Sequence, residues 1–144
     1  MFGLALKTPH DKVTLTPLPK GVKIRVSGLS ADTIPTVTEK NTAGVVANHI
    51  FKEFHLEQGV AIEIDKGILQ GKGLGSSAAS AAAVAFGLNE MFNLHLSNKE
   101  LVRLAAKGEV ASAGYAHADN VSAAICGGFV IVRSYDPLEI IGLQ

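Results

Sequence analysis

Three glycines followed by two serines have the residue types that bind phosphate. Gly71, Gly73 and Gly75 can adopt positive φ and permit close approach to the backbone, directly before an expected helix. Successive amide N–H groups there can converge on an anion, aided by the helix macrodipole. The spacing matches neither a Walker A loop nor a Gly-x-Ser-x-Gly nucleophile elbow. The alternative that the spacing leaves open is a glycine-rich turn in which Ser76 or Ser77 only caps the helix.

Two oxygen-bearing side chains are candidates for a magnesium site. One hydroxyl of the serine doublet can cap the helix while its neighbour, Ser77, coordinates Mg²⁺. Glu109 follows Gly108 at the expected end of another helix, where the macrodipole disfavours a further negative charge. A metal ion would compensate for that charge. The alternative is that Glu109 is a solvated glutamate with no partner.

A third candidate is the polar cluster of Tyr115, His117, Asp119 and Asn120, which lies among alanines in an expected loop. Histidine, aspartate and asparagine together can bind an ammonium, a carboxylate or a hydroxyl group. The alternative is a helix N-terminus that Asp119 or Asn120 caps. The histidines and the single cysteine lack the paired spacing of a zinc site.

The hydrophobic pattern indicates the elements that must position these residues. Alternating apolar residues predict two early strands joined by a tight connection and one later strand. A continuous apolar run predicts a buried strand at 129–132, and Pro137 opens a last strand. Apolar residues at three- and four-residue steps predict helices, the third of which opens with a capping box at Ser97 and Glu100. The expected strands cover 12–18, 22–26, 60–65, 129–132 and 138–141, and the expected helices 43–55, 76–93, 98–108 and 121–125. This order predicts an α+β layer sandwich rather than a doubly wound sheet.

The composition excludes several classes of protein. The chain has 144 residues, 47% of them hydrophobic, which is enough for one domain with a core. Its 13 basic and 13 acidic residues give zero net charge, which argues against binding to nucleic acid or to an anionic membrane. The longest apolar stretch, 78–88, is too short for a membrane span, and no signal peptide is expected.

The single cysteine, Cys126, lies between Ile125 and a pair of glycines. It cannot form an internal disulfide, and we expect a cytoplasmic location. The apolar and small neighbours predict that Cys126 is a small buried hydrophobic residue rather than a nucleophile.

The three candidate clusters occur in an order that resembles homoserine kinases of the GHMP small-molecule kinase superfamily. Gly-Leu-Gly-Ser-Ser-Ala-Ala-Ser at 73–80 is typical of the superfamily, and His-Ala-Asp-Asn at 117–120 points to homoserine kinases within it. Asn89-Glu90, Gly108-Glu109 and Gly127-Gly128-Phe129 complete the resemblance. It implies a fold like the second domain of ribosomal protein S5, with residues 1–144 as an ATP-binding N-terminal domain. It also implies ATP-dependent phosphorylation of the L-homoserine hydroxyl in threonine biosynthesis.

The resemblance assigns roles to individual residues. Ser77 and Glu109 match positions that hold Mg²⁺. Asn120 matches a homoserine contact, and His117 and Asp119 lie beside it. The expected catalytic group therefore consists of Glu109, Ser77 and Asn120. No side chain is expected to act as the base, because the proton passes to the phosphate. Asn41 and Lys66 match positions near the adenosine. The residues expected to bind ATP are Asn41, Lys66, Gly71, Lys72, Gly73, Leu74, Gly75, Ser76 and Ser77.

The sequence departs from the family pattern in three places. Leu69 stands where the superfamily usually has proline before the glycines, which loosens the loop slightly. A family segment similar to Asn-Leu-Gly-x-Gly-Phe-Asp and the C-terminal domain are both absent, so we expect a domain truncated at both ends. The expected partner is L-homoserine, without nucleic acid or membrane, and a homodimer is left open. The alternatives are a catalytically incomplete nucleotide-binding fragment, or a kinase of this superfamily for another small alcohol.

Overall fold

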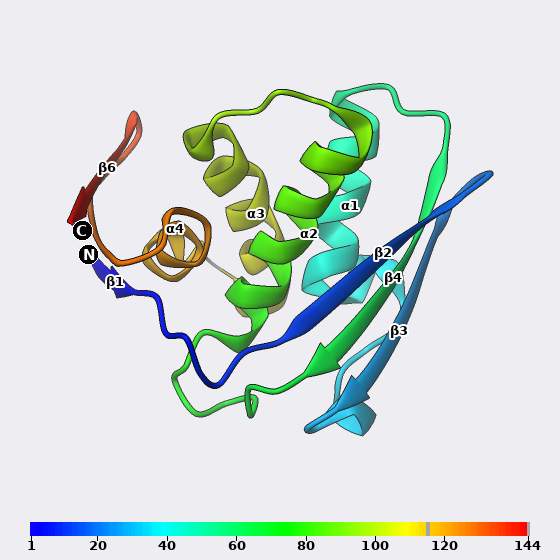
Figure 1. Cartoon of the computed structure of the whole chain (residues 1–144), viewed down its shortest axis with the longest axis horizontal. Coiled ribbons are helices and arrows are strands. Elements are labelled where there is room, and N and C mark those ends of the chain that lie inside the picture. Colours follow the sequence, from blue (N-terminus) through cyan, green and yellow to red (C-terminus); the bar gives the residue numbers. More distant parts are fainter. Residues whose placement is uncertain (115, 144) are drawn as a thin grey trace.

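The computed structural model describes residues 1–114 and 116–143, and within 111–113 only the backbone. Two three-stranded sheets enclose a layer of helices between them (Figure 1). The strands are β1 (Phe2–Leu4), β2 (Lys12–Leu18), β3 (Val22–Gly28), β4 (Gly59–Lys66), β5 (Phe129–Tyr135) and β6 (Leu138–Leu143). The helices are α1 (Thr42–Glu53), α2 (Ser76–Phe92), α3 (Asn98–Ala113) and α4 (Ala118–Cys126), with short 3₁₀ turns η1 (Ala31–Thr33) and η2 (Thr38–Lys40). The expected α+β architecture is confirmed.

The first sheet has the order β2-β4-β3, so the two strands joined by the tight connection at 19–21 do not pair with each other. Instead β4 lies between them, antiparallel to β2 and parallel to β3. Val60, Ile62 and Ile64 of β4 are buried toward the helices, which explains the alternation seen in the sequence. Pro17 is tolerated because β2 is an edge strand.

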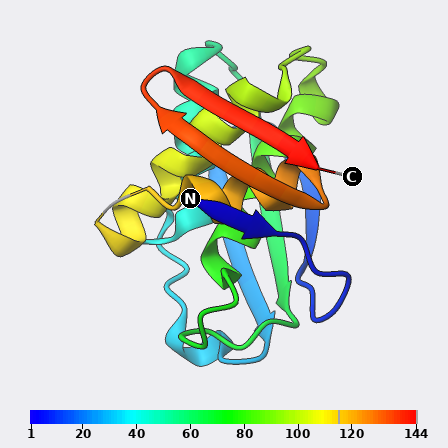
Figure 2. The same ribbon diagram turned by 90° about the vertical axis from the view of Figure 1, so that its left-hand side faces the viewer.

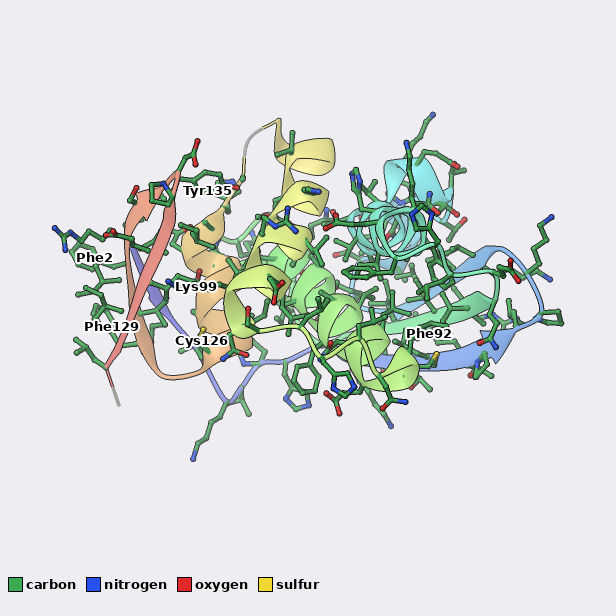
Figure 3. The ribbon with its side chains drawn as sticks, turned by 90° about the horizontal axis from the view of Figure 1, so that it is seen from above. Phe2, Phe92, Lys99, Cys126, Phe129 and Tyr135 are labelled. Carbon is green, nitrogen blue, oxygen red and sulfur yellow. The ribbon has the colours of Figure 1, made fainter. Side chains whose placement is uncertain are left out.

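The second sheet has the order β1-β5-β6. Strand β1 was not predicted, because three residues are too few for a periodic pattern; it is held by antiparallel pairing with β5. Strand β6 pairs with β5 and extends two residues beyond the prediction. Phe2 and Phe129 stack on the outer face of this sheet, away from the helices, with ring centroids 5.9 Å apart (Figure 3).

The helices form the middle layer, with α1 and α2 against the first sheet and α4 against the second (Figures 1 and 2). Helix α2 contacts α1, α3 and α4, and its alanines make this close packing possible. Gly87 of α2 allows Leu15 of β2 to lie against the helix, because a Cβ there would overlap the leucine side chain. No helix in the described part of the chain is long and apolar enough to cross a membrane.

Helix α3 continues five residues past Gly108, where we expected it to end. A Cβ on Gly108 would overlap the side chain of Val46 and the carbonyl of Thr42. This glycine therefore serves the close crossing of α1 and α3, and it does not terminate the helix. Ion pairs from Arg103 and Lys107 to Glu53 also join these two helices.

Helix α4 begins three residues earlier than predicted, at Ala118, and ends at Cys126. The prediction that Cys126 is buried is wrong, because its thiol lies at the exposed end of this short helix (Figure 3). Partial burial nevertheless raises the pKa of the Cys126 thiol.

Candidate functional site

The glycine loop connects β4 to α2 and spans residues 67–75. Gly71, Gly73 and Gly75 all have positive φ, at 75°, 74° and 67°. Apart from the glycine itself and its two neighbours in the chain, no described residue has an atom within 4 Å of where a Cβ on Gly71 or Gly73 would stand. These two glycines are therefore required by backbone conformation and not by crowding, and the space above them is open.

The N-terminus of α2 lies at the end of this loop, and the serines do not cap it. The N-cap is Gly75, and it makes no side-chain cap hydrogen bond to α2. The Ser76 hydroxyl donates instead to the carbonyl of Ile68, at 3.3 Å. The capping alternative for Ser76 and Ser77 is therefore wrong, and the helix presents N–H groups that an anion could accept from.

Ser77 and Glu109 meet although they lie on different helices. The Ser77 hydroxyl donates a hydrogen bond to the Glu109 carboxylate. Glu109 is 1% exposed, so the alternative of a solvated side chain is wrong, and Glu109 lies inside α3 rather than at its end. Burial raises the pKa of Glu109, and the Ser77 hydrogen bond and the nearby His117 lower it by less.

The polar cluster forms the start of α4 and the residue before it. His117 occupies the N-cap position, and none of the described side chains caps this helix. Asp119 and Asn120 lie within the first turn, so the capping alternative is wrong for both; Tyr115 lies outside the described residues. Asp119 Oδ1 is buried and has no hydrogen-bond partner among the described residues. The Asn120 side chain lies 3.3–3.5 Å from where a Cβ on Gly75 would stand, which places it beside the glycine loop.

Two clefts flank the glycine loop. The first, which we call the α1 cleft, has a volume of about 520 Å³. The second, which we call the α4 cleft, has a volume of about 480 Å³. The α1 cleft is lined by residues that include Pro35, Asn41, Lys66, Gly71, Ser77 and Ser80. The α4 cleft is lined by residues that include Leu6, His10, Leu74, Gly75, Phe86 and Asn120.

Asn41 and Lys66 both line the α1 cleft, but each also has a structural role. The Asn41 side chain caps α1 by accepting from the amides of Ala43 and Gly44, at 3.0 and 3.3 Å. The Lys66 ammonium forms a buried ion pair with Asp11 and donates to Ser80 Oγ at 3.0 Å. Asp11 and Ser80 were not among the sequence candidates. The available signals were an acidic residue directly before a strand and a serine one turn after Ser76.

The donor set fits a magnesium ion. Mg²⁺ prefers oxygen ligands and commonly keeps its waters or binds substrate phosphates, so it needs few protein ligands. Ser77 and Glu109 supply a hydroxyl and a carboxylate that already touch, next to a helix N-terminus open to an anion. Within 1–114 and 116–143 no three His, Cys, Asp or Glu side chains group as metal ligands, so such an ion would depend on other oxygens.

Comparison with known proteins identifies the family. The sequence profile of the GHMP kinases N terminal domain matches residues 41–128, which include the loop, Glu109 and the polar cluster. The chain belongs to the GHMP kinase family. This GHMP kinase chain is 51% identical over 141 residues to a homoserine kinase of Methanococcus maripaludis, covering 98% of this chain and 47% of that protein. It is 47% identical over 133 residues to a homoserine kinase of Natronomonas pharaonis, covering 92% of this chain and 43% of that protein.

Solved structures agree with this placement of the GHMP kinase chain. It superposes on a homoserine kinase from Cytophaga hutchinsonii with a TM-score of 0.92 and 39% identity, over 99% of this chain and 46% of the other. A mevalonate kinase from Methanococcus jannaschii shares the fold, with a TM-score of 0.72 and 16% identity, over 93% of this chain and 46% of the other. The chain spans about half the length of the curated relatives it matches.

Proposed function

We propose that residues 1–144 form the ATP-binding domain of a kinase that phosphorylates the hydroxyl of L-homoserine. The observation that carries this proposal is the open glycine loop at an uncapped helix N-terminus, adjacent to the Ser77–Glu109 pair. The acceptor is inferred from the relatives named homoserine kinase, at about half identity over nearly the whole chain. The product would be O-phosphohomoserine, which places the reaction in threonine biosynthesis.

The proposed binding of ATP uses the backbone of the loop. The amides between Gly71 and Ser77, which include those of Lys72 and Leu74, donate to the polyphosphate, and the exposed Lys72 adds positive charge. The α1 cleft, with Asn41 and Lys66 in its wall, lies on one side of the loop and would receive the nucleoside. Because these two side chains are engaged in the fold, they would shape the cleft more than bind the base.

The proposed metal site consists of the Ser77 hydroxyl and the Glu109 carboxylate. A bound Mg²⁺ would neutralise part of the negative charge on the phosphates. Glu109 must be ionised to act as a ligand, and its raised pKa means that it gives up its proton less readily than an exposed glutamate. The hydrogen bond between Ser77 and Glu109 and the burial of Glu109 would position these two oxygens for the metal.

The proposed acceptor site lies in the α4 cleft. Asn120 faces this cleft beside Gly75, and its amide can hydrogen-bond the hydroxyl that receives the phosphoryl group. His117 and Asp119 flank it at the start of α4. No side chain is assigned as the base, since phosphoryl transfer depends mainly on positioning and charge stabilisation. The hydroxyl proton would then pass to the transferred phosphate.

A coupled assay of ADP release tests this function directly. The chain is incubated with Mg²⁺ and ATP and with homoserine, mevalonate or shikimate as acceptor. Homoserine-dependent ADP release is the expected result. Release with another alcohol but not with homoserine would refute the substrate while preserving the kinase assignment.

A second candidate is a nucleotide-binding unit without turnover of its own. It is favoured by the length comparison, because this chain covers 47% of the M. maripaludis relative. Calorimetric titration with a non-hydrolysable ATP analogue separates the two candidates. Binding without ADP release supports the second, and turnover by this chain excludes it.

A further inference from the structure

Asp11, directly before β2, makes an unusually large number of interactions for one carboxylate. Its Oδ1 accepts hydrogen bonds from the amides of Gly67 and Ile68, both at 3.0 Å. Its Oδ2 accepts from the Lys66 ammonium and, at 3.1 Å, from Ser80 Oγ. The Asp11 and Lys66 side chains are 2% and 4% exposed. A carboxylate this buried is tolerable because these four donors satisfy both of its oxygens.

These interactions join the two ends of the glycine loop. Gly67 and Ile68 begin the loop, while Ser80 lies in the first turns of α2, just beyond its end. The loop is also closed by the hydrogen bond from Ser76 Oγ to the carbonyl of Ile68. The ends of the loop are thus fixed, whereas Gly71 and Gly73 at its centre stand in open space.

The Lys66 ammonium is fully engaged in this arrangement. Besides Asp11 it donates to the carbonyl of Ser76 at 3.1 Å and to Ser80 Oγ at 3.0 Å. An ammonium group has three donors, and all three are used within the protein. Lys66 is therefore placed to support the loop and has no donor left for a ligand in this arrangement.

The Asp11–Lys66 pair also lies between the two clefts. Asp11 lines the α4 cleft and Lys66 lines the α1 cleft. The backbone there is tightly packed, because a Cβ on Gly67 would overlap the carbonyl oxygen of His10. A substitution of Asp11 would consequently alter both the start of the glycine loop and the wall between the α1 cleft and the α4 cleft.

We propose that Asp11 is a positioning residue for the nucleotide site, which acts by anchoring the Gly67 and Ile68 amides so that the glycine loop is held open for a polyphosphate. This inference rests on the proposed function, in which the loop binds ATP. Asp11 itself touches no phosphate in this proposal. Its contribution is to fix the loop before the nucleotide arrives, which reduces the ordering cost of binding.

The decisive experiment compares Asp11→Asn with Asp11→Leu in this chain. Both substitutions remove the charge and leave Lys66 without its ion pair, but only asparagine keeps an oxygen that can accept from the Gly67 and Ile68 amides. Amide hydrogen exchange by NMR without nucleotide then reports on the loop alone. We expect these two amides to exchange about tenfold or more faster in Asp11→Leu than in Asp11→Asn, with equal protection in β4 and α3.

ATP affinity is measured in the same variants by calorimetry. We expect Asp11→Leu to weaken ATP binding about tenfold and Asp11→Asn to weaken it about threefold or less. The matched control is Arg25→Met with Glu63→Gln, which removes an exposed ion pair at 3.8 Å between β3 and β4. This control should leave loop exchange and ATP affinity unchanged.

Ser80→Ala tests the same proposal if the Asp11 variants unfold. It removes one donor to Asp11, and alanine is well tolerated in a helix. Faster exchange of Gly67 and Ile68 without a lower melting temperature supports the proposal. Equal loop exchange and equal ATP affinity in Asp11→Asn and Asp11→Leu would overturn it. Failure of the unaltered chain to bind ATP would instead overturn the proposed function, which the nucleotide-free exchange data do not depend on.

Discussion

At the residue scale, Glu109 is a charged residue type in an almost fully buried position. A carboxylate that is 1% exposed needs stabilising contacts, and Ser77 supplies one of them. Burial still raises its pKa, so the fold accommodates this group at some cost. Such a cost is common where a side chain is retained for binding or chemistry rather than for stability.

Replacing Glu109 with glutamine tests its proposed role toward magnesium. The change preserves shape but removes the charge, so we expect Mg·ATP binding to weaken by about tenfold or more while binding of ATP in EDTA is nearly unchanged. Calorimetric titrations under both conditions measure this difference. Glu57→Gln, an exposed site after α1, is the control and should behave like the unaltered chain. An equal loss with and without magnesium would contradict the metal role.

The raised pKa of Glu109 also predicts how stability depends on pH. The folded chain holds this proton more tightly than the unfolded chain, so the contribution of Glu109 is fully present below its ordinary pKa of 4.5. It is lost as the pH rises through the folded-state pKa. Without magnesium, Glu109→Gln should therefore raise the melting temperature relative to the unaltered chain more at pH 7 than at pH 4. Thermal unfolding followed by circular dichroism measures this, and a difference that is constant with pH would contradict it.

At the scale of the element, α3 positions Glu109 through features that lie at different places along it. Its first turn is held by the capping box, in which Ser97 Oγ accepts from the Glu100 amide and Glu100 accepts from the Ser97 amide at 2.8 Å. Farther along the helix, Gly108 permits the close crossing with α1. Glu109 follows on the face that meets Ser77 of α2.

Loss of the cap should destabilise α3. Ser97→Ala removes the hydroxyl that accepts from the first turn, and we expect a loss of about 1 kcal/mol in the free energy of unfolding. Urea denaturation measures it. Ser97→Thr keeps a capping hydroxyl and should lose much less. Equal losses in the two variants would show that the hydroxyl does not cap the helix in solution.

At the scale of the whole molecule, α2 lies at the centre of the helical layer. It contacts the other three helices and β2, and its Leu88 is fully buried in the core cluster. Helix α2 also begins at the candidate phosphate site. The packing of the core and the placement of the site are therefore properties of the same helix.

Truncating Leu88 should consequently have a large effect on global stability. Leu88→Ala leaves a cavity that the surrounding helices fill only partly, so we expect a loss of roughly 2–5 kcal/mol. Leu29→Ala, at a leucine that is 48% exposed after β3, should cost far less. Chemical denaturation of both variants provides the comparison, and similar losses would contradict the central place of Leu88.

The features that depend on neighbouring residues could be predicted from the sequence. Apolar periodicity located the main strands and helices, Ser97 and Glu100 identified a helix start, and the glycines identified the loop before α2. These features depend on local backbone sterics, hydrogen bonds within a few residues, and the spacing of side chains on one face. The family motifs are likewise short and continuous, so they could be recognised directly.

The contacts between residues far apart in the sequence could be learned only from the packed fold. It placed β4 between β2 and β3, recruited β1 to β5, and showed that Gly108 lies within a helix. It also buried Glu109 beside Ser77, exposed Cys126, and brought Asp11 to amides 56 and 57 residues away. No local pattern encodes such contacts, because burial and partner choice depend on how all the elements pack at once.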